Sequence, residues 1–309
     1  MNWRAKGLIQ QVLSRVPGGQ RLNSLLQQRL GGLKNVSSNV DTKVRADWLV
    51  LVDHLQRLSW PLEGCRYVEI GTGWYPTLPV CFHLVGAATC HTYDLSRLAD
   101  AELTKRMLAR LAVHLEQISA KTGVSQELLQ ERLVRLQQAA DFNEFCSRAG
   151  IEYHAPADAT VTTLPAGSVD VVFSNSVLEH VTKDALDGLM HETRRILRPG
   201  GLAVHSVNCG DHYAYFDRTV SPINYLRYTE SHWKLWNNDL QYQNRLRPDD
   251  FLASAQRAGL ELVLNMQRPR PELLAKFESL RIAPEFRHYS REQLCTTSVD
   301  FVGRAPNVT

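Results

Sequence analysis

The chain has 309 residues, of which 44% are hydrophobic and 22% charged, and its formal net charge is +3. This balance is typical of a soluble globular protein, and the sequence contains no run of about 20 apolar residues that could span a membrane. The start of the sequence lacks the apolar core of a signal peptide, and the six cysteines show neither a C-x-x-C pair nor zinc-type spacing. We therefore expect buried thiols and a cytoplasmic protein.

Residues 1–40 form a basic arm that differs from the rest of the chain. Every charged residue before Asp41 is a lysine or an arginine, and apolar residues recur at helical spacing from Trp3 to Val16. A basic amphipathic helix of this kind can lie on the anionic inner face of a membrane, or it can pack over a ligand site or a second copy of the chain. The remaining chain is net negative, so we expect no nucleic-acid partner.

The next segment predicts a helix, a strand and a glycine turn. The helix runs from about Asp41 to Leu58, and the apolar strand Tyr67–Ile70 leads into Gly71-Thr72-Gly73 before a second helix. Glycine lets the backbone approach a ligand closely, and a helix start presents unpaired N–H donors. Together they predict a crevice of nucleotide size.

A second strand, His91–Leu95, carries a carboxylate at a telling distance. Asp94 follows Gly73 by 21 residues, where an acidic side chain can accept hydrogen bonds from two ribose hydroxyls. A nicotinamide dinucleotide and S-adenosylmethionine both fit this spacing. The dinucleotide fingerprint needs a third glycine where Pro76 stands, so the glycine pattern favours S-adenosylmethionine.

A long insertion at about residues 97–150 separates the second strand from the third, Ile151–His154. Its apolar pattern predicts two amphipathic helices, one from Leu103 to Ile118 and one from Leu129 to Ala140. Such a helical hairpin could be a lid, a dimer surface or a brace with no contact to a ligand.

The third strand is followed by Ala157-Asp158-Ala159, and further elements complete a recognisable order. They are the strand 169–175, a helix from an N-cap at Thr182 to Leu197, and a strand at 202–207. The sequences VEIGTG, VDVVFSNSVLEHV and LRPGG, with Asp94 and Asp158 between them, resemble those of the class I S-adenosylmethionine-dependent methyltransferases. The resemblance is close over residues 60–210.

The resemblance implies a fold and a cofactor site. The fold is an α/β, Rossmann-like sheet of seven mostly parallel strands over residues 41–309, with helices on both faces and the last two strands, Glu261–Met266 and Ser298–Arg304, paired antiparallel at one edge. The implied cofactor, S-adenosyl-L-methionine, is assigned by analogy to these residues: Glu69, Gly71 and Gly73 at the methionine part, Asp94 at the ribose, Asp158 at the adenine, and Ser174 and Asn175 beneath the sulfonium.

An aromatic segment at about residues 211–245 follows the fifth strand, where this superfamily commonly builds its substrate wall. Aromatic faces suit sugar rings or planar phenols. We expect Tyr213 and Tyr215 to contact the substrate, and Arg245 to bind a phosphate or carboxylate on it. A helix near Leu273–Leu280 is expected between the last two strands.

A hydroxyl acceptor must lose its proton, and the candidate groups lie at the carboxyl ends of strands four and five. We expect His212 to be the general base, with Asp211 binding the acceptor, and His180 to be the alternative catalytic residue. His180, Asp211 and His212 could together hold a divalent metal ion, but their spacing in the sequence matches no fixed ligand pattern, so we expect no metal site.

The segment after the fifth strand also resembles that of methyltransferases from bacterial cell-surface polysaccharide clusters. This looser resemblance implies an O-methyltransferase that transfers a methyl group in line to a sugar or glycan hydroxyl. Two alternatives remain open from the sequence: a phenolic or polyketide-like acceptor, and a catalytically silent subunit that binds the cofactor and a partner.

Overall fold

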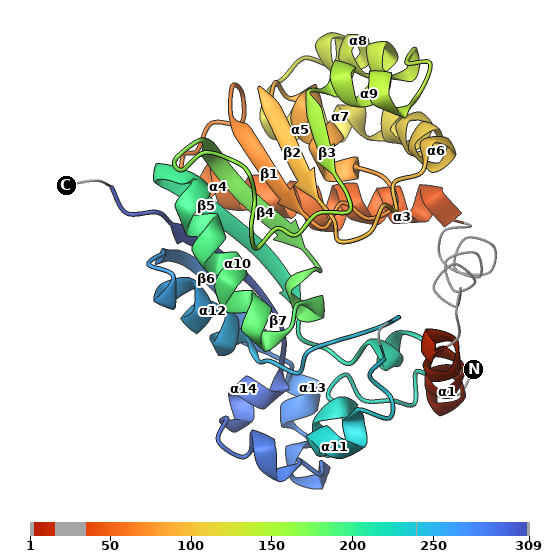
Figure 1. Ribbon diagram of the computed structural model, residues 1–309, viewed down its shortest axis with the longest axis vertical. Helices are drawn as coiled ribbons and strands as arrows, with labels where there is room; N and C mark the ends of the chain where they lie inside the picture. Colours follow the sequence, from red (N-terminus) through yellow and green to blue (C-terminus); the bar gives the residue numbers. More distant parts are fainter. Residues whose placement is uncertain (1–2, 16–34, 239, 308–309) are drawn as a thin grey trace.

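The computed structural model describes residues 3–15, 35–238 and 240–307 (Figure 1). Its centre is a seven-stranded sheet with the order β3-β2-β1-β4-β5-β7-β6, in which β7 runs antiparallel to both of its neighbours and the other strands are parallel to one another. The strands are β1 Arg66–Ile70, β2 Thr89–Tyr93, β3 Ile151–His154, β4 Val169–Asn175, β5 Leu197–Asn208, β6 Glu261–Pro269 and β7 Thr296–Arg304. This order and the antiparallel edge confirm the fold predicted from the sequence.

One face of the sheet is covered by a nearly continuous helical run that precedes β1. The run consists of α3 Val36–Thr42, the π-helical η2 Lys43–Trp48 and α4 Leu49–Arg57, and it buries Trp48 against α5 Thr77–Leu84. The helix predicted to begin at Asp41 begins earlier, because the Asn35 side chain accepts a hydrogen bond from the Ser38 N–H and caps it. The expected arm boundary at residue 40 therefore falls inside α3.

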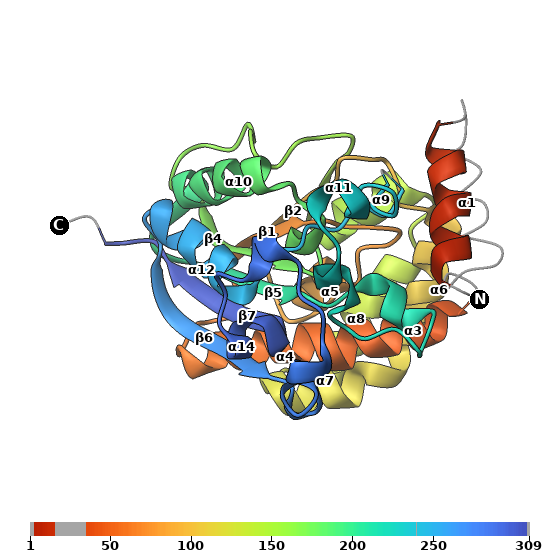
Figure 2. The same ribbon diagram turned by 90° about the horizontal axis from the view of Figure 1, so that it is seen from below.

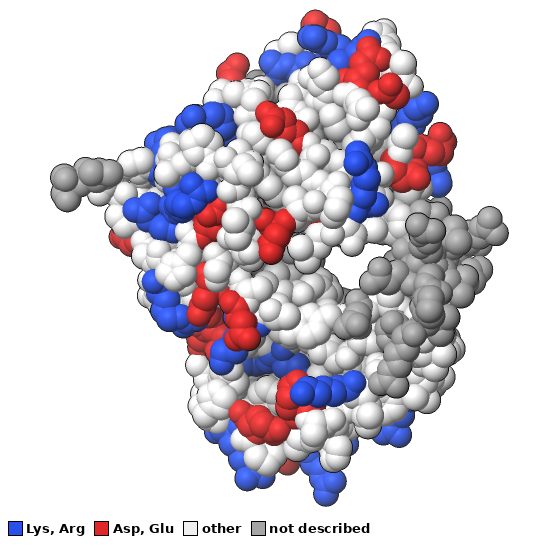
Figure 3. All heavy atoms as spheres, viewed as in Figure 1, with Lys and Arg blue, Asp and Glu red and all other residues white. Residues whose placement is uncertain are grey.

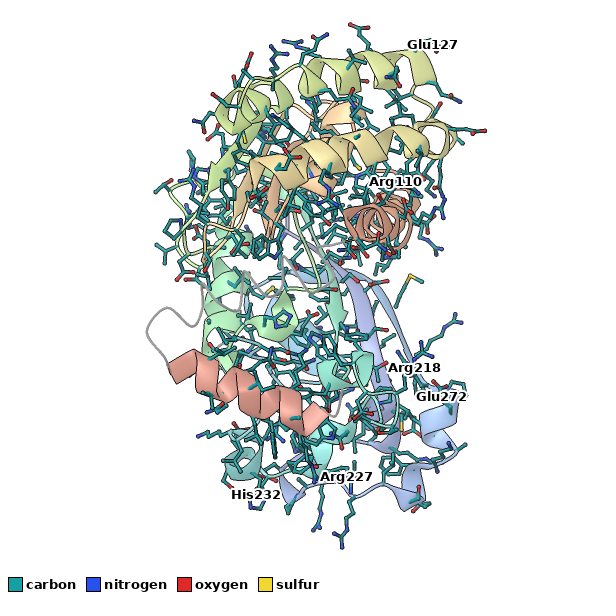
Figure 4. The ribbon with its side chains drawn as sticks, turned by 90° about the vertical axis from the view of Figure 1, so that its right-hand side faces the viewer. Arg110, Glu127, Arg218, Arg227, His232 and Glu272 are labelled. Carbon is teal, nitrogen blue, oxygen red and sulfur yellow. The ribbon has the colours of Figure 1, made fainter. Side chains whose placement is uncertain are left out.

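The insertion between β2 and β3 contains more helices than predicted. They are α6 Ala101–Leu111, α7 Leu115–Thr122, α8 Gln126–Gln137 and α9 Phe142–Ala149, with the 3₁₀ turn η3 Ala112–His114 between α6 and α7. The Asp41 carboxylate joins α3 to this insertion, because it accepts two hydrogen bonds of 2.8 Å from Arg110 and lies 2.7 Å from His114 Nε2. Figure 4 labels Arg110 beside that helical run, so α6 braces it.

The opposite face of the sheet carries α10 Lys183–Ile196 and α12 Pro248–Arg257. Both bury apolar residues in one core cluster on this face, among them Met190 and Phe251. The helix α10 contacts β5, and α12 contacts β6 and β7. The predicted N-cap of α10 is confirmed, since Thr182 Oγ1 accepts a hydrogen bond from the Ala185 N–H.

Two segments far apart in the sequence join into a small aromatic module with a core of its own. One segment follows β5 and the other lies between β6 and β7. The module contains η5 His212–Tyr215, η6 Asn224–Arg227, α11 Glu230–Trp233, α13 Pro271–Leu274, η7 Phe277–Ser279, η8 Pro284–Phe286 and α14 Arg291–Cys295. The helix expected at Leu273–Leu280 is therefore wrong in length: it is split into α13 and η7, and only its first turn is buried at Leu273. Figure 4 labels Arg227, His232 and Glu272 on the module's outer side.

The first helix, α1 Trp3–Arg15, packs on this aromatic module (Figures 1 and 2). The Trp3 ring lies 5.2 Å from that of Tyr213 and 5.1 Å from that of Trp236, measured between centroids. Gly7 permits the approach, since a Cβ there would lie 3.0 Å from the Tyr213 hydroxyl. The basic residues Arg21, Arg29 and Lys34 of the arm lie outside the described residues.

Two further expectations from the sequence can be compared with the described residues. All six cysteines are buried free thiols, as predicted. Among the helices that the structure describes, none has the length and apolar character needed to cross a bilayer.

Candidate active site

A large cavity of about 1110 Å³ opens at the carboxyl ends of β1, β2 and β4. Figure 3 shows the molecule hollowed between the sheet and the aromatic module. The cavity lining includes the glycine turn after β1, the loop after β2, the segment 157–160 and the turn after β4. The insertion reaches it through the loop that precedes α6, at Leu98, so the described helices α6 to α9 do not close over it as a lid.

The glycine turn and the end of β2 are tied together in this cavity. Gly71 and Gly73 both have positive φ, +86° and +69°, which favours glycine. The Gly73 N–H donates to Asp94 Oδ2 at 3.0 Å, and the Ser96 N–H donates to Asp94 Oδ1 at 3.1 Å. The Asp94 carboxylate is thus held at the cavity wall, where it retains acceptor capacity for hydroxyl donors of a ligand.

Glu69 lies behind the turn rather than in the cavity. It is buried, and its Oε2 accepts a hydrogen bond from Thr92 Oγ1 at 2.8 Å. The Thr92 hydroxyl also shares a hydrogen bond with the hydroxyl of Thr72, which does line the cavity. Burial raises the pKa of Glu69 to about 7. The structure therefore gives Glu69 a supporting position, and not the direct ligand contact expected from the sequence.

Of the other residues assigned to the cofactor, two line the cavity and one lies behind its wall. Asp158 and Asn175 line the cavity. Ser174 does not line it, because its side chain is buried and its hydroxyl lies 2.8 Å from His205 Nδ1 on the neighbouring strand. The expected place of Ser174 on the cavity floor is thus taken by Asn175.

Two charged residues that were not expected at the site also line this cavity. Lys43 and Asp47 project from η2, one turn apart. Burial raises the pKa of Asp47, and the nearby Lys43 ammonium opposes that shift. A π-helical turn often marks a functional site, but the sequence pattern predicted only a regular helix here.

A second pocket of about 500 Å³ adjoins the large cavity. It is lined by Lys6, His180, His212, Tyr215, Phe216, Leu240, Gln241 and Tyr242, and His180 lines both spaces. The Lys6 ammonium of α1 lies 2.9 Å from the centre of the Phe216 ring, and burial lowers the pKa of Lys6 to about 8. The junction thus has aromatic walls and a cation beside it.

Two histidines meet at the junction of the cavity and the pocket. The ring centroids of His180 and His212 are 5.1 Å apart, and His180 Nδ1 lies 2.6 Å from the Tyr242 carbonyl oxygen. Burial, with smaller contributions from repulsion by His180 and Lys6, lowers the pKa of His212 to about 4. The His180 ring is open to the cavity, yet protein surrounds enough of it that desolvation lowers its pKa too. Both imidazoles are therefore neutral near pH 7.

Glu179, which sequence reasoning missed, lies beneath these histidines. Its side chain is 1% exposed, and its Oε1 lies 3.9 Å from His212 Nε2. Burial raises the pKa of Glu179 to about 8, and the backbone N–H groups of Glu179 and Asn208, which do not reach hydrogen-bond geometry, offset only part of that shift. The signal in the sequence was a glutamate directly before His180, four residues past the end of a buried strand.

Asp211 is a correction to the expected acceptor site. The residue is buried and holds its own loop, because it accepts hydrogen bonds from the Tyr213 N–H at 2.8 Å and from Asn224 Nδ2 at 3.1 Å. Burial raises the pKa of Asp211 to about 6. It lines neither the large cavity nor the second pocket.

The expected substrate contacts also differ in the structure. Arg245 is buried, and its guanidinium donates to the Tyr228 carbonyl at 2.5 Å and to Glu230 at 2.6 Å, so it stabilises the aromatic module. Tyr213 is buried as well, with its hydroxyl donating to the Trp236 carbonyl at 2.7 Å. Tyr215, 66% exposed, does line the second pocket.

The fold and this cavity define a class I methyltransferase, and comparison with known proteins agrees. Residues 41–265 match the family model described as a methyltransferase domain, so the chain belongs to that family. It is therefore an enzyme, and its cofactor is S-adenosyl-L-methionine. The glycine turn and the Asp94 carboxylate at the cavity wall fit that molecule.

Solved structures with the same general fold are distant in sequence. A putative sarcosine dimethylglycine methyltransferase from Galdieria sulphuraria is 14% identical, with 84% of each chain covered and a TM-score of 0.43. An S-adenosylmethionine-dependent methyltransferase from Mesorhizobium loti is 18% identical, covering 84% of this chain and 97% of that one, with a TM-score of 0.44. A geranyl diphosphate methyltransferase is 16% identical, covering 84% and 77%, with a TM-score of 0.46. Among curated proteins, none matches this chain.

Proposed function

We propose that this methyltransferase methylates a hydroxyl oxygen of a sugar or glycan. The observation that carries the proposal is that His180 lines both the large cavity and the second pocket. The large cavity, with Asp94 and the glycine turn, continues past His180 into the second pocket, whose walls are aromatic. A methyl donor in the first space and an acceptor in the second would meet at the His180–His212 pair.

In the large cavity, the residues that would hold the cofactor are Asp94 at the ribose, the glycine turn at the methionine part, and Asp158 with Asn175 at the far wall. Bound S-adenosylmethionine supplies a methyl group on a sulfonium, which is a good leaving group. The protein's own contribution is then to align the acceptor oxygen and to exclude competing water.

In the second pocket, Tyr215 and Phe216 offer ring faces that suit the apolar face of a sugar, and Lys6 offers a charge for a phosphate or carboxylate on the acceptor. The two neutral histidines lie where the acceptor hydroxyl must lose its proton. Removing that proton at a fixed geometry contributes a rate factor of roughly 10²–10⁴.

The proposal is tested by following S-adenosylhomocysteine formation with a panel of acceptors. The panel contains nucleotide-linked sugars, lipid-linked sugars, free glycans and simple phenols. Turnover that needs a sugar, and that stops with the deoxy sugar lacking one hydroxyl, supports the proposal. Turnover of phenols with none for sugars would overturn the acceptor class, and binding of S-adenosylmethionine with no turnover would favour a silent subunit.

We also propose that α1 touches an anionic membrane surface and so brings a lipid-linked acceptor to the second pocket. The helix exposes Leu8, Ile9 and Val12 at 56%, 53% and 63%, while its opposite side supplies Lys6 to the pocket. Flotation with anionic vesicles tests this. Co-flotation lost in a Leu8→Ser, Ile9→Ser double variant supports it, and absence of wild-type binding at low salt would overturn it.

A further inference from the structure

The side chain of Glu179 is the least satisfied polar group beside the active site. Both of its carboxylate oxygens are buried and have no hydrogen-bond partner among the described residues. Burying a carboxylate without a partner is costly, so native proteins pair such a group with a cation or neutralise it. No lysine or arginine forms an ion pair with Glu179 within the described ranges, and the nearest basic atom given for it is His212 Nε2 at 3.9 Å.

Each of the two imidazoles near Glu179 can offer one ring nitrogen as a metal ligand. His180 Nδ1 faces the Tyr242 carbonyl oxygen at 2.6 Å and must therefore carry a proton, which leaves Nε2 of that ring as an acceptor. His212 Nε2 is buried and has no hydrogen-bond partner among the described residues. One ligand atom from each of Glu179, His180 and His212 lies within 4.8 Å of the others.

We propose that Glu179, His180 and His212 form a binding site for one divalent transition-metal ion at the junction of the large cavity and the second pocket. Two imidazoles and one carboxylate suit ions such as Co²⁺, Mn²⁺ or Zn²⁺ and leave coordination positions open. Atoms bound to one tetrahedral ion at about 2.1 Å lie about 3.4 Å apart. A pair of ligand atoms at the 4.8 Å limit must therefore close by about 1.4 Å, or about 0.7 Å of movement by each side chain.

A second cluster, His91, Glu152 and His154, has similar spacing but differs in its surroundings. Its carboxylate is 60% exposed and therefore hydrated. Its two histidines already face each other, with His91 Nδ1 3.3 Å from His154 Nε2, and the His154 ring stacks on Tyr93. It has no buried carboxyl group without hydrogen-bond partners among the described residues, so this cluster serves as the matched control.

The role of the ion rests on the proposed function. His180 and His212 line the second pocket, so the open coordination positions face the acceptor. An acceptor hydroxyl bound there loses its proton to water more readily, because the cation stabilises the alkoxide. The oxygen then forms the bond to the methyl carbon, the carbon–sulfur bond breaks, and its electron pair stays on sulfur. In this arrangement His212 holds the ion instead of taking the proton itself.

The binding test uses the untagged full-length chain, first treated with a chelator and then titrated with Co²⁺, whose visible absorption reports histidine and carboxylate ligands. We expect one ion per chain and a rise in melting temperature with Co²⁺. Loss of a residue that only supports a metal ligand weakens metal binding by ~10–100-fold. Glu179→Gln and His212→Ala remove ligands themselves, so each should weaken Co²⁺ binding by more than that. His154→Ala should bind as the wild type does.

Folding and function are separated in the same series. Each variant is first shown to bind S-adenosylhomocysteine as the wild type does, so that loss of Co²⁺ binding is not loss of fold. No Co²⁺ binding by the wild type, or binding lost in His154→Ala and kept in Glu179→Gln, would overturn the site. If the site binds Co²⁺ but no sugar is methylated, the site stands and the acceptor class is wrong. If sugar methylation is unchanged after chelation, the ion's catalytic role is overturned.

Discussion

Gly71 and Val177, which follow β1 and β4, lie next to each other in the wall of the large cavity. A Cβ added to Gly71 would lie 2.4 Å from Val177 Cγ2, well inside van der Waals contact. The same glycine has φ +86°, a conformation that costs other residues roughly 1–2 kcal/mol. Two independent constraints therefore keep this position free of a side chain, and both act in the wall of the large cavity, where we propose that the cofactor binds.

Gly71→Ala should weaken S-adenosylhomocysteine binding by roughly tenfold or more, since the turn must move to relieve the contact. Adding Val177→Ala should recover part of the loss by removing the clash while the strain of the positive φ remains. Calorimetry on both single variants and the double variant measures this. Full affinity in Gly71→Ala would show that the turn does not contact the cofactor.

Asp94→Asn removes a charged acceptor that also fixes the Gly73 N–H at 3.0 Å. Hydrogen bonds to charged groups are worth about 1.5–3 kcal/mol, so we expect the dissociation constant for S-adenosylhomocysteine to rise by roughly 10–100-fold. Asp53→Asn on the outer side of α4 is the control and should leave this dissociation constant unchanged. Equal affinities in wild type and Asp94→Asn contradict the ribose assignment.

Glu69 should make folding stability depend on pH. Its pKa is raised to about 7 from 4.5, so between those values the folded chain keeps a proton that the unfolded chain has lost. The stabilisation from this group is full below about pH 4.5 and is lost as pH rises through about 7, a difference of about 3 kcal/mol. Urea unfolding of wild type and Glu69→Gln measures it. The free energy of unfolding of the variant should increase relative to that of the wild type as pH rises. A difference between the two proteins that does not change with pH would contradict the raised pKa of Glu69.

Trp3→Ala should release α1 from the aromatic module and remove Lys6 from the second pocket. Loss of a buried tryptophan costs about 3–5 kcal/mol at a core site, enough to undock one short helix. We expect KM for the acceptor to rise while S-adenosylhomocysteine affinity is unchanged. Ala5→Ser, at an exposed position of the same helix, is the control. An unchanged acceptor KM in Trp3→Ala would remove α1 from the acceptor site.

The sequence predicted the sheet well because its signals are local. The apolar strand before Gly71, the carboxylate at Asp94 and the cap at Thr182 each specify an element or a turn from neighbouring residues. The aromatic module could not be predicted from the sequence, because its core combines two segments that α12 and β6 separate. It also includes Trp3, which lies near the start of the chain.

The site residues show the same division between local and long-range information. Arg245 and Asp211 looked like ligand contacts because they are charged and follow β5, but burial within the module uses their hydrogen bonds. Glu179 was not predicted because its importance depends on the lack of a hydrogen-bond donor near its buried carboxylate. A missing hydrogen-bond partner is visible only once the chain is folded.

The central claim is that one cavity holds the cofactor and opens at His180 toward a separate acceptor pocket. A crystal structure with bound S-adenosylhomocysteine tests it most directly. We predict ribose hydroxyls on Asp94, backbone contact at Gly71 and Gly73, and a sulfur that faces His180 and the second pocket. A ligand bound with its ribose away from Asp94, or with its sulfur turned from His180, would contradict the account.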